Sequence, residues 1–228
     1  MPRDVGVIVV AAGRGSRLGA SVPKQYLPVA GVPVLLRAIR PFVAHPDVRQ
    51  VIAVLPADDV AAPPDWLAGL TGEAFSLVAG GATRQDSVAA GLGALDPSCA
   101  IVLVHDGARP FPPREAIDGG IAAARDGHAA VPAVPLADTL KRADDCGTVL
   151  GTVPRAGLWR AQTPQAFPRA LLARAHAAAP THAVEITDDA MLVELVGGRV
   201  DLLPGSARNL KITRPDDLEF AEWLAGRP

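Results

Sequence analysis

Short β-branched runs alternate with helix-compatible segments along the first 135 residues of this chain. The runs are bounded by Gly, Pro or Asp, and they are Val5–Val10, Val48–Leu55, Phe75–Val78, Ala100–Val104 and Ala129–Val134. Ala, Leu and Ile recur at helical spacing between them, in Pro33–Val43, Asp58–Leu70, Arg84–Leu95 and Pro113–Arg125. Parallel strands need crossover connections of this kind. We therefore predict an α/β fold, a Rossmann-like, mostly parallel sheet with helices on both faces.

The pattern changes after Pro135, where residues 137–156 are typical of two strands around the turn Asp144–Gly147. A hairpin arm that projects from the sheet would expose apolar side chains such as Val149 and Leu150. Pairing with a second copy of the chain would cover them. We therefore predict a homodimer formed through this β-arm.

Beyond the arm the α/β pattern returns. We predict strands at Leu158–Thr163, Arg199–Leu203 and Asn209–Thr213, and helices at Arg169–Ala179, Asp188–Leu195 and Pro215–Ala225. The 228 residues are compatible with a single domain over 1–228, in which 137–156 is the arm insertion.

Composition narrows the classes of partner. The 22 basic residues nearly balance 24 acidic ones, so no global charge favours a nucleic acid or a membrane surface as partner. No apolar run reaches the roughly 18 residues that span a bilayer, and the chain starts without the pattern of a signal segment. Cys99 and Cys146 are far apart and fit no metal motif. We expect a cytoplasmic protein.

The first strand leads into a glycine-rich loop that contains Gly13 and Gly15. Small residues leave backbone N–H groups accessible to a polyanion, and the cations Arg14, Arg17 and Lys24 follow closely, as a nucleoside triphosphate would require. Leu18 occupies the place of the third glycine of a dinucleotide-binding loop, and neither glycine begins a P-loop. The alternative is a tight strand-to-helix turn in which the glycines serve only the backbone.

Two further segments carry polar groups at predicted strand ends. Asp106 is the best candidate to hold a divalent metal, directly or through water, or to accept hydrogen bonds from a polyol, and Arg109 suits a phosphate. A simple salt bridge between them is the alternative. Lys211 and Thr213 would share one face of a strand and suit a phosphate, whereas a solvated edge strand in which Thr213 caps the last helix is equally compatible.

The segment Gly80–Ser87 is a glycine turn that enters a helix, and it could line a nucleobase pocket or simply cap the helix. The five histidines show no metal-like spacing, and none is predicted to be catalytic.

Taken together, the motifs resemble those of the 2-C-methyl-D-erythritol 4-phosphate cytidylyltransferase family. The motifs that carry the resemblance are Ala11-Ala-Gly-Arg-Gly-Ser-Arg-Leu18, Pro23-Lys-Gln-Tyr26, Gly80-Gly-Ala-Thr-Arg-Gln-Asp-Ser-Val88, Val104-His-Asp-Gly-Ala-Arg-Pro110, Asp138-Thr-Leu-Lys141, Ala161-Gln-Thr-Pro-Gln165, Ile186-Thr-Asp-Asp-Ala190 and Asn209-Leu-Lys-Ile-Thr-Arg-Pro-Asp-Asp-Leu218. The resemblance implies that CTP and methylerythritol phosphate react, with Mg²⁺, to the CDP-linked alcohol and pyrophosphate of non-mevalonate isoprenoid synthesis.

The resemblance also implies roles for individual residues. The catalytic group is Arg17, Lys24, Lys211 and Asp106, of which Asp106 would also be the metal contact. The nucleotide would be bound by Ala11, Ala12, Gly13, Gly15, Gly81, Ala82, Ser87 and Gly107. The methylerythritol phosphate would be framed by Arg109, Thr139, Arg155, Thr163, Thr187 and Thr213. Thr139 and Arg155, which the arm carries, would reach into the partner's site.

Three positions depart from the family pattern: Val10, where proline is frequent, Ala82, where aspartate is common, and Gly107, where alanine is common. Two other functions fit parts of the pattern. One is a cytidylyltransferase for another polyol phosphate such as ribitol 5-phosphate, against which Arg155 and Thr163 count. The other is a nucleotide-binding regulatory protein without catalysis, against which the joint presence of the four catalytic candidates counts.

Overall fold

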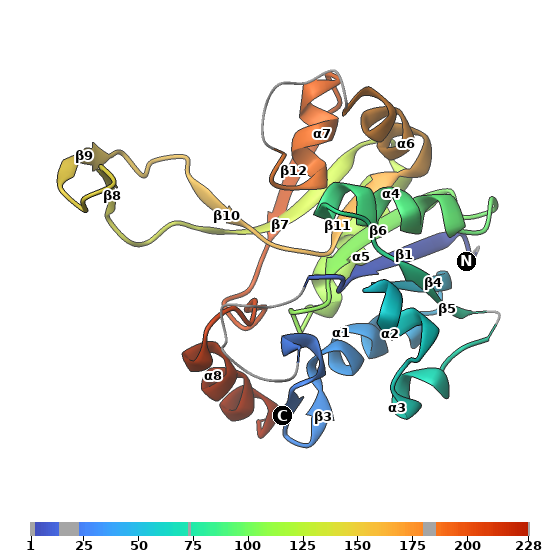
Figure 1. The fold of residues 1–228 in the computed structure, drawn as a ribbon. Helices are drawn as coiled ribbons and strands as arrows, with labels where there is room; N and C mark the ends of the chain where they lie inside the picture. The colour runs from blue at the N-terminus through green and yellow to red at the C-terminus, as the bar shows by residue number, and fades with distance from the viewer. Residues whose placement is uncertain (1–2, 14–22, 73, 180–185, 228) are drawn as a thin grey trace.

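The computed structural model describes residues 3–13, 23–72, 74–179 and 186–227 (Figure 1). Its main sheet has the strand order β10-β7-β11-β6-β1-β4-β5, and β12 pairs with β7. The strands are β1 (Val5–Val10), β4 (Val48–Leu55), β5 (Phe75–Ala79), β6 (Ile101–Asp106), β7 (Ala129–Pro135), β10 (Trp159–Ala161), β11 (Gln165–Pro168) and β12 (Val200–Pro204). Within this sheet, only β10 and β11 run antiparallel to the described strands beside them. The predicted mostly parallel α/β sheet is confirmed.

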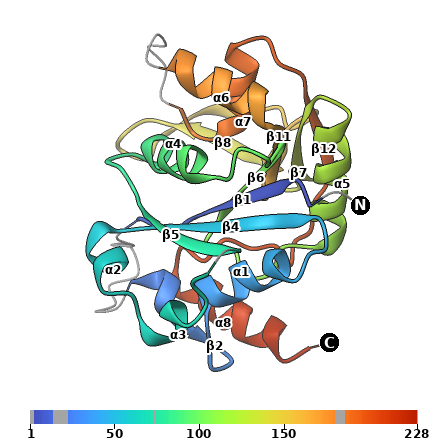
Figure 2. The ribbon, with the colours of Figure 1, turned by 90° about the vertical axis from the view of Figure 1, so that its right-hand side faces the viewer.

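Helices cover both faces of this sheet, and the alternation of side chains along β1 shows why. Val7 and Val9 belong to the core on the face covered by α1 (Val34–Val43) and α5 (Arg114–Arg125). Ile8 points to the opposite core, which α4 (Arg84–Ala94), α6 (Arg169–Ala178) and α7 (Asp189–Leu195) cover. Figure 2 shows β1 and β4 between α4 and α1. Burial on both faces explains the continuous apolar runs of these strands.

The remaining elements are short or peripheral. They are the 3₁₀ helix η2 (Lys24–Tyr26), β2 (Pro28–Val29), β3 (Val32–Pro33), α2 (Ala57–Ala61), α3 (Asp65–Ala68) and α8 (Pro215–Ala225). The small core under α8 contains Val29, Val34 and Ile212. Through this core, the segment that leads to α8 packs against β2 and the start of α1.

Two sequence-based predictions of elements are wrong. The helix predicted over Asp58–Leu70 is divided into α2 and α3, because Pro63 and Pro64 lack the N–H groups that a continuous helix needs. The strand predicted over Asn209–Thr213 is not a strand, although the Ile212 N–H donates to the Ala108 carbonyl at 2.9 Å. Ala108 lies beyond the end of β6, so no ladder continues there.

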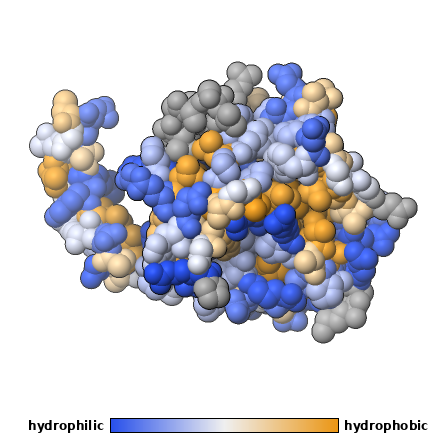
Figure 3. All heavy atoms as spheres, turned by 90° about the horizontal axis from the view of Figure 1, so that it is seen from below, coloured by the Kyte–Doolittle hydropathy of each residue, from blue (hydrophilic) through white to orange (hydrophobic). Residues whose placement is uncertain are grey.

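The predicted hairpin is present as β8 (Leu140–Ala143) and β9 (Val149–Val153), and it projects from the body on the chain that connects β7 to β10 (Figure 1). Val149 and Leu150 at its tip are 57% and 64% exposed. Figure 3 shows the arm apart from the body with hydrophobic atoms on its surface. A role of the arm in dimerisation stays a prediction. No described helix is long and apolar enough to cross a membrane.

Candidate active site

A pocket of about 380 Å³ lies at the carboxyl ends of the parallel strands, where open α/β sheets bind their ligands. It is lined by Val10, Ala11, Ala12, Gly13, Lys24, Gln25, Gly81, Ala82, Thr83, Arg84, Ser87, Asp106, Ala108 and Lys211. The three loops that follow β1, β5 and β6 therefore converge on one pocket. Gly15 and Arg17 are predicted site residues that lie outside the described residues.

In the first loop, the backbone of Ala11 is hydrogen-bonded to neighbouring segments, whereas the backbone N–H groups of Ala12 and Gly13 have no described acceptor. The Ala11 N–H donates to the Val54 carbonyl at 2.8 Å, and the Ala11 carbonyl accepts from Gln25 Nε2 at 3.0 Å. No described residue accepts a hydrogen bond from the amides of Ala12 and Gly13, which line the pocket. These two amides are suitably placed to bind an anion.

The second loop is held by its own side chains. Ser87 Oγ accepts from the Gly81 N–H at 3.2 Å and donates to the Thr83 carbonyl at 2.9 Å. A Cβ at Gly81 would come within 2.3 Å of Asp86 Cβ, so only glycine fits there. Ser87 is buried, while Ala82 is exposed at the pocket. Ser87 and Gly81 thus shape the predicted base pocket chiefly by fixing the loop.

Asp106 is surrounded by three cations. Its Oδ2 lies 3.1 Å from Lys211 Nζ and 3.3 Å from Arg109 Nε, and its Oδ1 lies 3.7 Å from Arg84 Nε. Burial alone would raise the pKa of Asp106, but the charges of Lys211, Arg84 and Arg109 outweigh burial and hold that pKa well below its usual range. The cluster combines one carboxylate with three cations, an arrangement that attracts a polyanion.

Arg84 is a charged pocket residue that receives no role from the sequence alone. Its Nη1 lies 2.6 Å from Oδ2 of Asp189, which is 1% exposed and also contacts His176 Nε2 at 3.0 Å. Burial lowers the pKa of Arg84, but Asp189 and Asp106 more than offset it and the pKa is raised. Arg84 therefore joins the pocket to the start of α7. The signal in the sequence was its place inside the glycine-turn motif, directly after the helix cap Thr83.

Thr163 lies next to Asp106 in a buried chain of hydrogen bonds. Its Oγ1 accepts from the Asp106 N–H and lies 3.0 Å from His105 Nδ1. His105 Nε2 lies 3.0 Å from the Arg109 carbonyl, so we assign the proton to Nε2 and let Thr163 donate to Nδ1. Burial lowers the pKa of His105 to about 4, which keeps the ring neutral. Thr163, predicted to bind substrate, thus supports the backbone of Asp106.

None of the six predicted substrate-binding residues is among the described residues that line the pocket, and four of them lie away from Asp106. Thr139 and Arg155 are exposed on the arm, where Arg155 donates to the Ala137 carbonyl. Thr187 is exposed just before α7, and Thr213 Oγ1 donates to Asp217 Oδ2 at 2.7 Å.

Gly107 and Arg109 support the pocket from its border. The Gly107 N–H donates to the Val10 carbonyl at 2.8 Å, and a Cβ there would come within 2.8 Å of Ala11 Cβ. Arg109 contacts Asp106 and donates to the Asn209 carbonyl at 2.7 Å. The glycine at position 107 therefore fits the close approach of the first loop.

The described residues do not form a chelating metal site. No group of three or more His, Cys, Asp or Glu side chains that could hold a metal occurs among them. Asp106 is a single carboxylate that already pairs with three cations. Among the described residues, Asp106 alone therefore provides no chelating set for a divalent cation.

Comparisons with known proteins identify the family of this chain. The family model described as 2-C-methyl-D-erythritol 4-phosphate cytidylyltransferase matches residues 5–227. The enzyme of that name from Carboxydothermus hydrogenoformans is 42% identical over 98% of this chain and 96% of its own. The bifunctional enzyme IspD/IspF of Desulfotalea psychrophila is 46% identical over 96% of this chain and 56% of its own.

Solved structures show the same relationship. The crystal structure of 2-C-methyl-D-erythritol 4-phosphate cytidylyltransferase from Thermus thermophilus has a TM-score of 0.79 and 40% identity, and the match covers 97% of this chain and 98% of that one. The family match spans the pocket loops as well as the arm. The chain belongs to the 2-C-methyl-D-erythritol 4-phosphate cytidylyltransferase family.

Proposed function

We propose that this protein transfers CMP from CTP to 2-C-methyl-D-erythritol 4-phosphate and releases pyrophosphate. The product is 4-diphosphocytidyl-2-C-methyl-D-erythritol, an intermediate of non-mevalonate isoprenoid synthesis. The observation that carries the proposal is the pocket itself, which Ala12 and Gly13 line together with Asp106 and its cations Lys211 and Arg84. The family match over residues 5–227 supports the choice of substrates.

The chemistry needs charge neutralisation more than proton transfer. A phosphate monoester carries between one and two negative charges near neutral pH, because its second pKa is about 6. An oxygen of the monoester phosphate attacks the α-phosphorus of CTP. The bond between that phosphorus and the oxygen that bridges the α- and β-phosphates breaks, and pyrophosphate leaves with the bridging oxygen. The barrier is the repulsion between two anions, which positioning and fixed cations reduce. This accounts for a site with Lys and Arg side chains and a neutral His105.

We assign the cations to different parts of the nucleotide. Lys24 neutralises the triphosphate together with Arg17, and Lys211 contacts the α-phosphate during transfer. The Lys211 side chain is 42% exposed, so its ammonium can contact Asp106 and a phosphate oxygen in the same pocket. Asp106 and Arg109 contact the hydroxyls of ribose and substrate. Gly81, Ala82 and Ser87 form the cytosine pocket, largely through the backbone that Ser87 fixes.

We propose that Mg²⁺ enters bound to the triphosphate. The single carboxylate of Asp106, already paired with cations, supports contact through water rather than direct chelation.

The site also needs groups that this chain's pocket does not supply. Thr139 and Arg155 are predicted to bind methylerythritol phosphate, yet both are exposed on the projecting arm. We propose a homodimer in which each arm delivers Thr139 and Arg155 to the pocket of its partner. The exposed Val149 and Leu150 would be covered by the same contact.

Pyrophosphate release tests the proposed function. The purified protein is supplied with CTP and Mg²⁺ and either methylerythritol phosphate or ribitol 5-phosphate, with UTP as the control nucleotide. We expect turnover only with CTP and methylerythritol phosphate. Preference for ribitol 5-phosphate would replace the substrate, and binding of CTP without release of pyrophosphate would indicate a regulatory protein.

A further inference from the structure

Gln162 is a buried amide that joins two parts of the chain on the border of the active site. It follows β10, and its N–H donates to the Pro132 carbonyl at 2.7 Å. Its side chain pairs with the backbone of Ser206 in both directions: Nε2 donates to the Ser206 carbonyl at 2.8 Å, and Oε1 accepts from the Ser206 N–H at 3.1 Å. This two-way contact fixes the segment after β12.

The same network reaches the catalytic candidates through Asn209. The Asn209 carbonyl accepts from both Gln162 Nε2, at 3.3 Å, and Arg109 Nη1, at 2.7 Å. Asn209 Nδ2 donates to the carbonyl of Thr163 at 2.8 Å, and the Thr163 hydroxyl accepts from the Asp106 N–H. Gln162 is therefore two contacts away from the Arg109 guanidinium, and Lys211 follows Asn209 by two residues.

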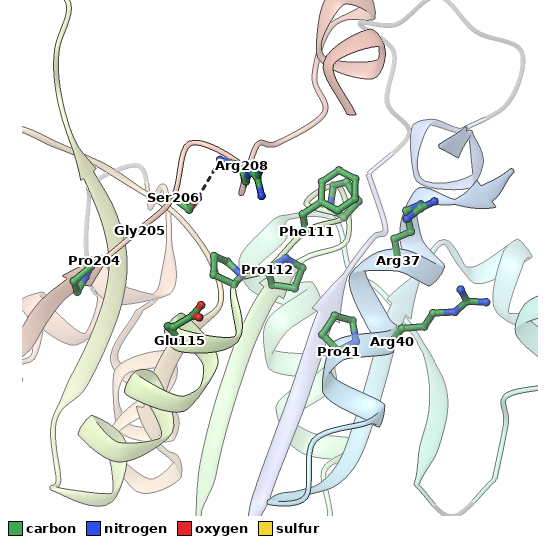
Figure 4. Close-up of a pocket in the computed structure, with 12 residues that line it drawn as sticks. Arg37, Arg40, Pro41, Phe111, Pro112, Glu115, Pro204, Gly205, Ser206 and Arg208 are labelled. Carbon is green, nitrogen blue, oxygen red and sulfur yellow. Dashed lines mark hydrogen bonds between the residues drawn. The ribbon is translucent and has the colours of Figure 1, made fainter. Parts of the chain in front are cut away.

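On its outer side, the segment after β12 borders a hollow and has few packing partners. Figure 4 shows Pro204, Ser206 and Arg208 on one side of a hollow of about 700 Å³, with Phe111 and Pro112 across from them. The position of the segment thus depends on its inner side. There, a Cβ at Gly205 would come within 2.6 Å of Gln162 Oε1 and 2.9 Å of the Ala133 carbonyl oxygen, so the packing is tight.

Packing alone does not account for these two amides. Asn209 is fully buried, and no donor among the described residues reaches its Oδ1. An unpaired buried acceptor destabilises the folded state. Gln162 and Asn209 thus form a buried polar pair with one unsatisfied acceptor, and the Asn209 carbonyl also accepts from Arg109, which is consistent with selection for geometry at the site.

We propose that Gln162 is a positioning residue for nucleotidyl transfer. Its amide holds Ser206 and the Asn209 carbonyl, and through them sets Arg109 and Lys211 against Asp106. The proposal rests on the proposed function, since it concerns the placement of the cations that act in that reaction. Gln162 itself touches no reacting atom.

The test replaces Gln162 by a side chain of similar length without the amide. We expect Gln162→Met to lower kcat about tenfold or more while KM for CTP changes less than twofold. Gly205→Ala, which pushes the segment away from Gln162 at an independent position, should give the same kinetic signature. Leu172→Ala is the matched control, because Leu172 is a fully buried core residue of α6 outside this hydrogen-bond network. Its truncation should lower Tm without moving the segment after β12.

A double-variant comparison separates positioning from loss of stability. If Gln162 acts on the carbonyl that Arg109 also contacts, Gln162→Met should cost much less activity in an Arg109→Ala background than alone. In a Ser87→Ala background its cost should be unchanged, because Ser87 contacts neither Gln162 nor the segment. Equal costs in both backgrounds would overturn the proposal.

Failure of the proposed function and failure of this inference look different. Absence of pyrophosphate release by the unmodified protein would remove the function itself. An active unmodified protein whose Gln162→Met and Gly205→Ala variants keep kcat within twofold would overturn only the role of Gln162. Activity losses that follow Tm as they do in Leu172→Ala would overturn it as well.

Discussion

Lys211 Nζ lies 3.1 Å from Asp106 Oδ2, so the cation assigned to the α-phosphate is paired with the carboxylate at the end of β6. Arg109 and Arg84 approach the same carboxylate. Asp106 therefore keeps three like charges close together, two of them on residues that line the pocket. An incoming triphosphate shares these cations with Asp106.

Replacement of that carboxylate should separate binding of a polyanion from turnover. We expect Asp106→Asn to bind pyrophosphate several-fold more tightly at low salt, because the three cations lose their internal neutraliser, while kcat falls about 10²-fold because their placement is lost. Titration calorimetry and steady-state rates measure the two effects. Asp118→Asn is the control, since Asp118 pairs with Arg114 and His45 away from the pocket. Unchanged pyrophosphate affinity would contradict this account of Asp106.

The two lysines should matter chiefly in the transition state. We expect Lys24→Ala and Lys211→Ala each to lower kcat about 10²-fold, the cost of removing one fixed donor to developing charge. Arg49→Ala removes a cation that pairs with Asp96 outside the pocket and should leave kcat unchanged. Either lysine variant with a normal rate would lose its assigned role.

The sequence predicts the architecture where its patterns are long. β1 is buried along most of its length and β4 is buried from Val51 to Leu55, and both strands have the predicted bounds. β11 was not predicted because four residues between Pro164 and α6 carry too little pattern. Residues 209–213 alternate in polarity like a strand, but only one backbone hydrogen bond, from Ile212, ties them to the loop after β6.

In the site, too, residues that belong to local motifs are predicted from the sequence, whereas contacts between distant segments are not. Asp106, Lys24 and Lys211 were predicted from their motifs, and the structure brings them to one pocket. The pairing of Arg84 with Asp189 joins residues 105 positions apart, and no local pattern reports that α4 and α7 begin side by side. The support of Asp106 by Thr163 likewise depends on the antiparallel placement of β11 beside β6.

The bridge from Arg84 to Asp189 should be important for stability. Arg84→Met leaves the buried Asp189 carboxylate with His176 as its remaining described ionic partner, and we expect a loss of about 3 kcal/mol in the free energy of unfolding. Urea denaturation measures it. The double variant Arg84→Met/Asp189→Asn should recover part of the loss, because no unpaired charge is then buried. A double variant less stable than the single one would contradict this explanation.

The arm should act in trans. We expect Arg155→Ala to raise KM for methylerythritol phosphate more than it lowers kcat, because the proposed role of Arg155, which lies on the arm, is to bind the sugar phosphate. A mixture of Arg155→Ala and Lys24→Ala chains, each weakly active, should recover activity, since some mixed dimers contain one intact site. Sedimentation at the assay concentration confirms the dimer. A mixture no more active than its components would place each complete site within one chain.

His105 should make the folded protein less stable as the pH falls. Burial lowers the pKa of His105 to about 4 from its ordinary 6.5, so the unfolded chain takes up a proton that the folded chain excludes. The contribution of neutral, buried His105 to the free energy of unfolding is complete above pH 6.5, decreases as the pH falls, and is lost near pH 4. Linkage gives a loss of about 2 kcal/mol between pH 7 and pH 5.

Urea denaturation at these two pH values checks the loss. His105→Gln keeps a donor and an acceptor for the Arg109 carbonyl and Thr163 but does not titrate. At pH 7 this variant should be less stable than the unmodified protein. On going from pH 7 to pH 5, its free energy of unfolding should fall by about 2 kcal/mol less than that of the unmodified protein. Parallel pH dependences in the two proteins would show that His105 is not the group that titrates, because every other ionisable group is shared between them.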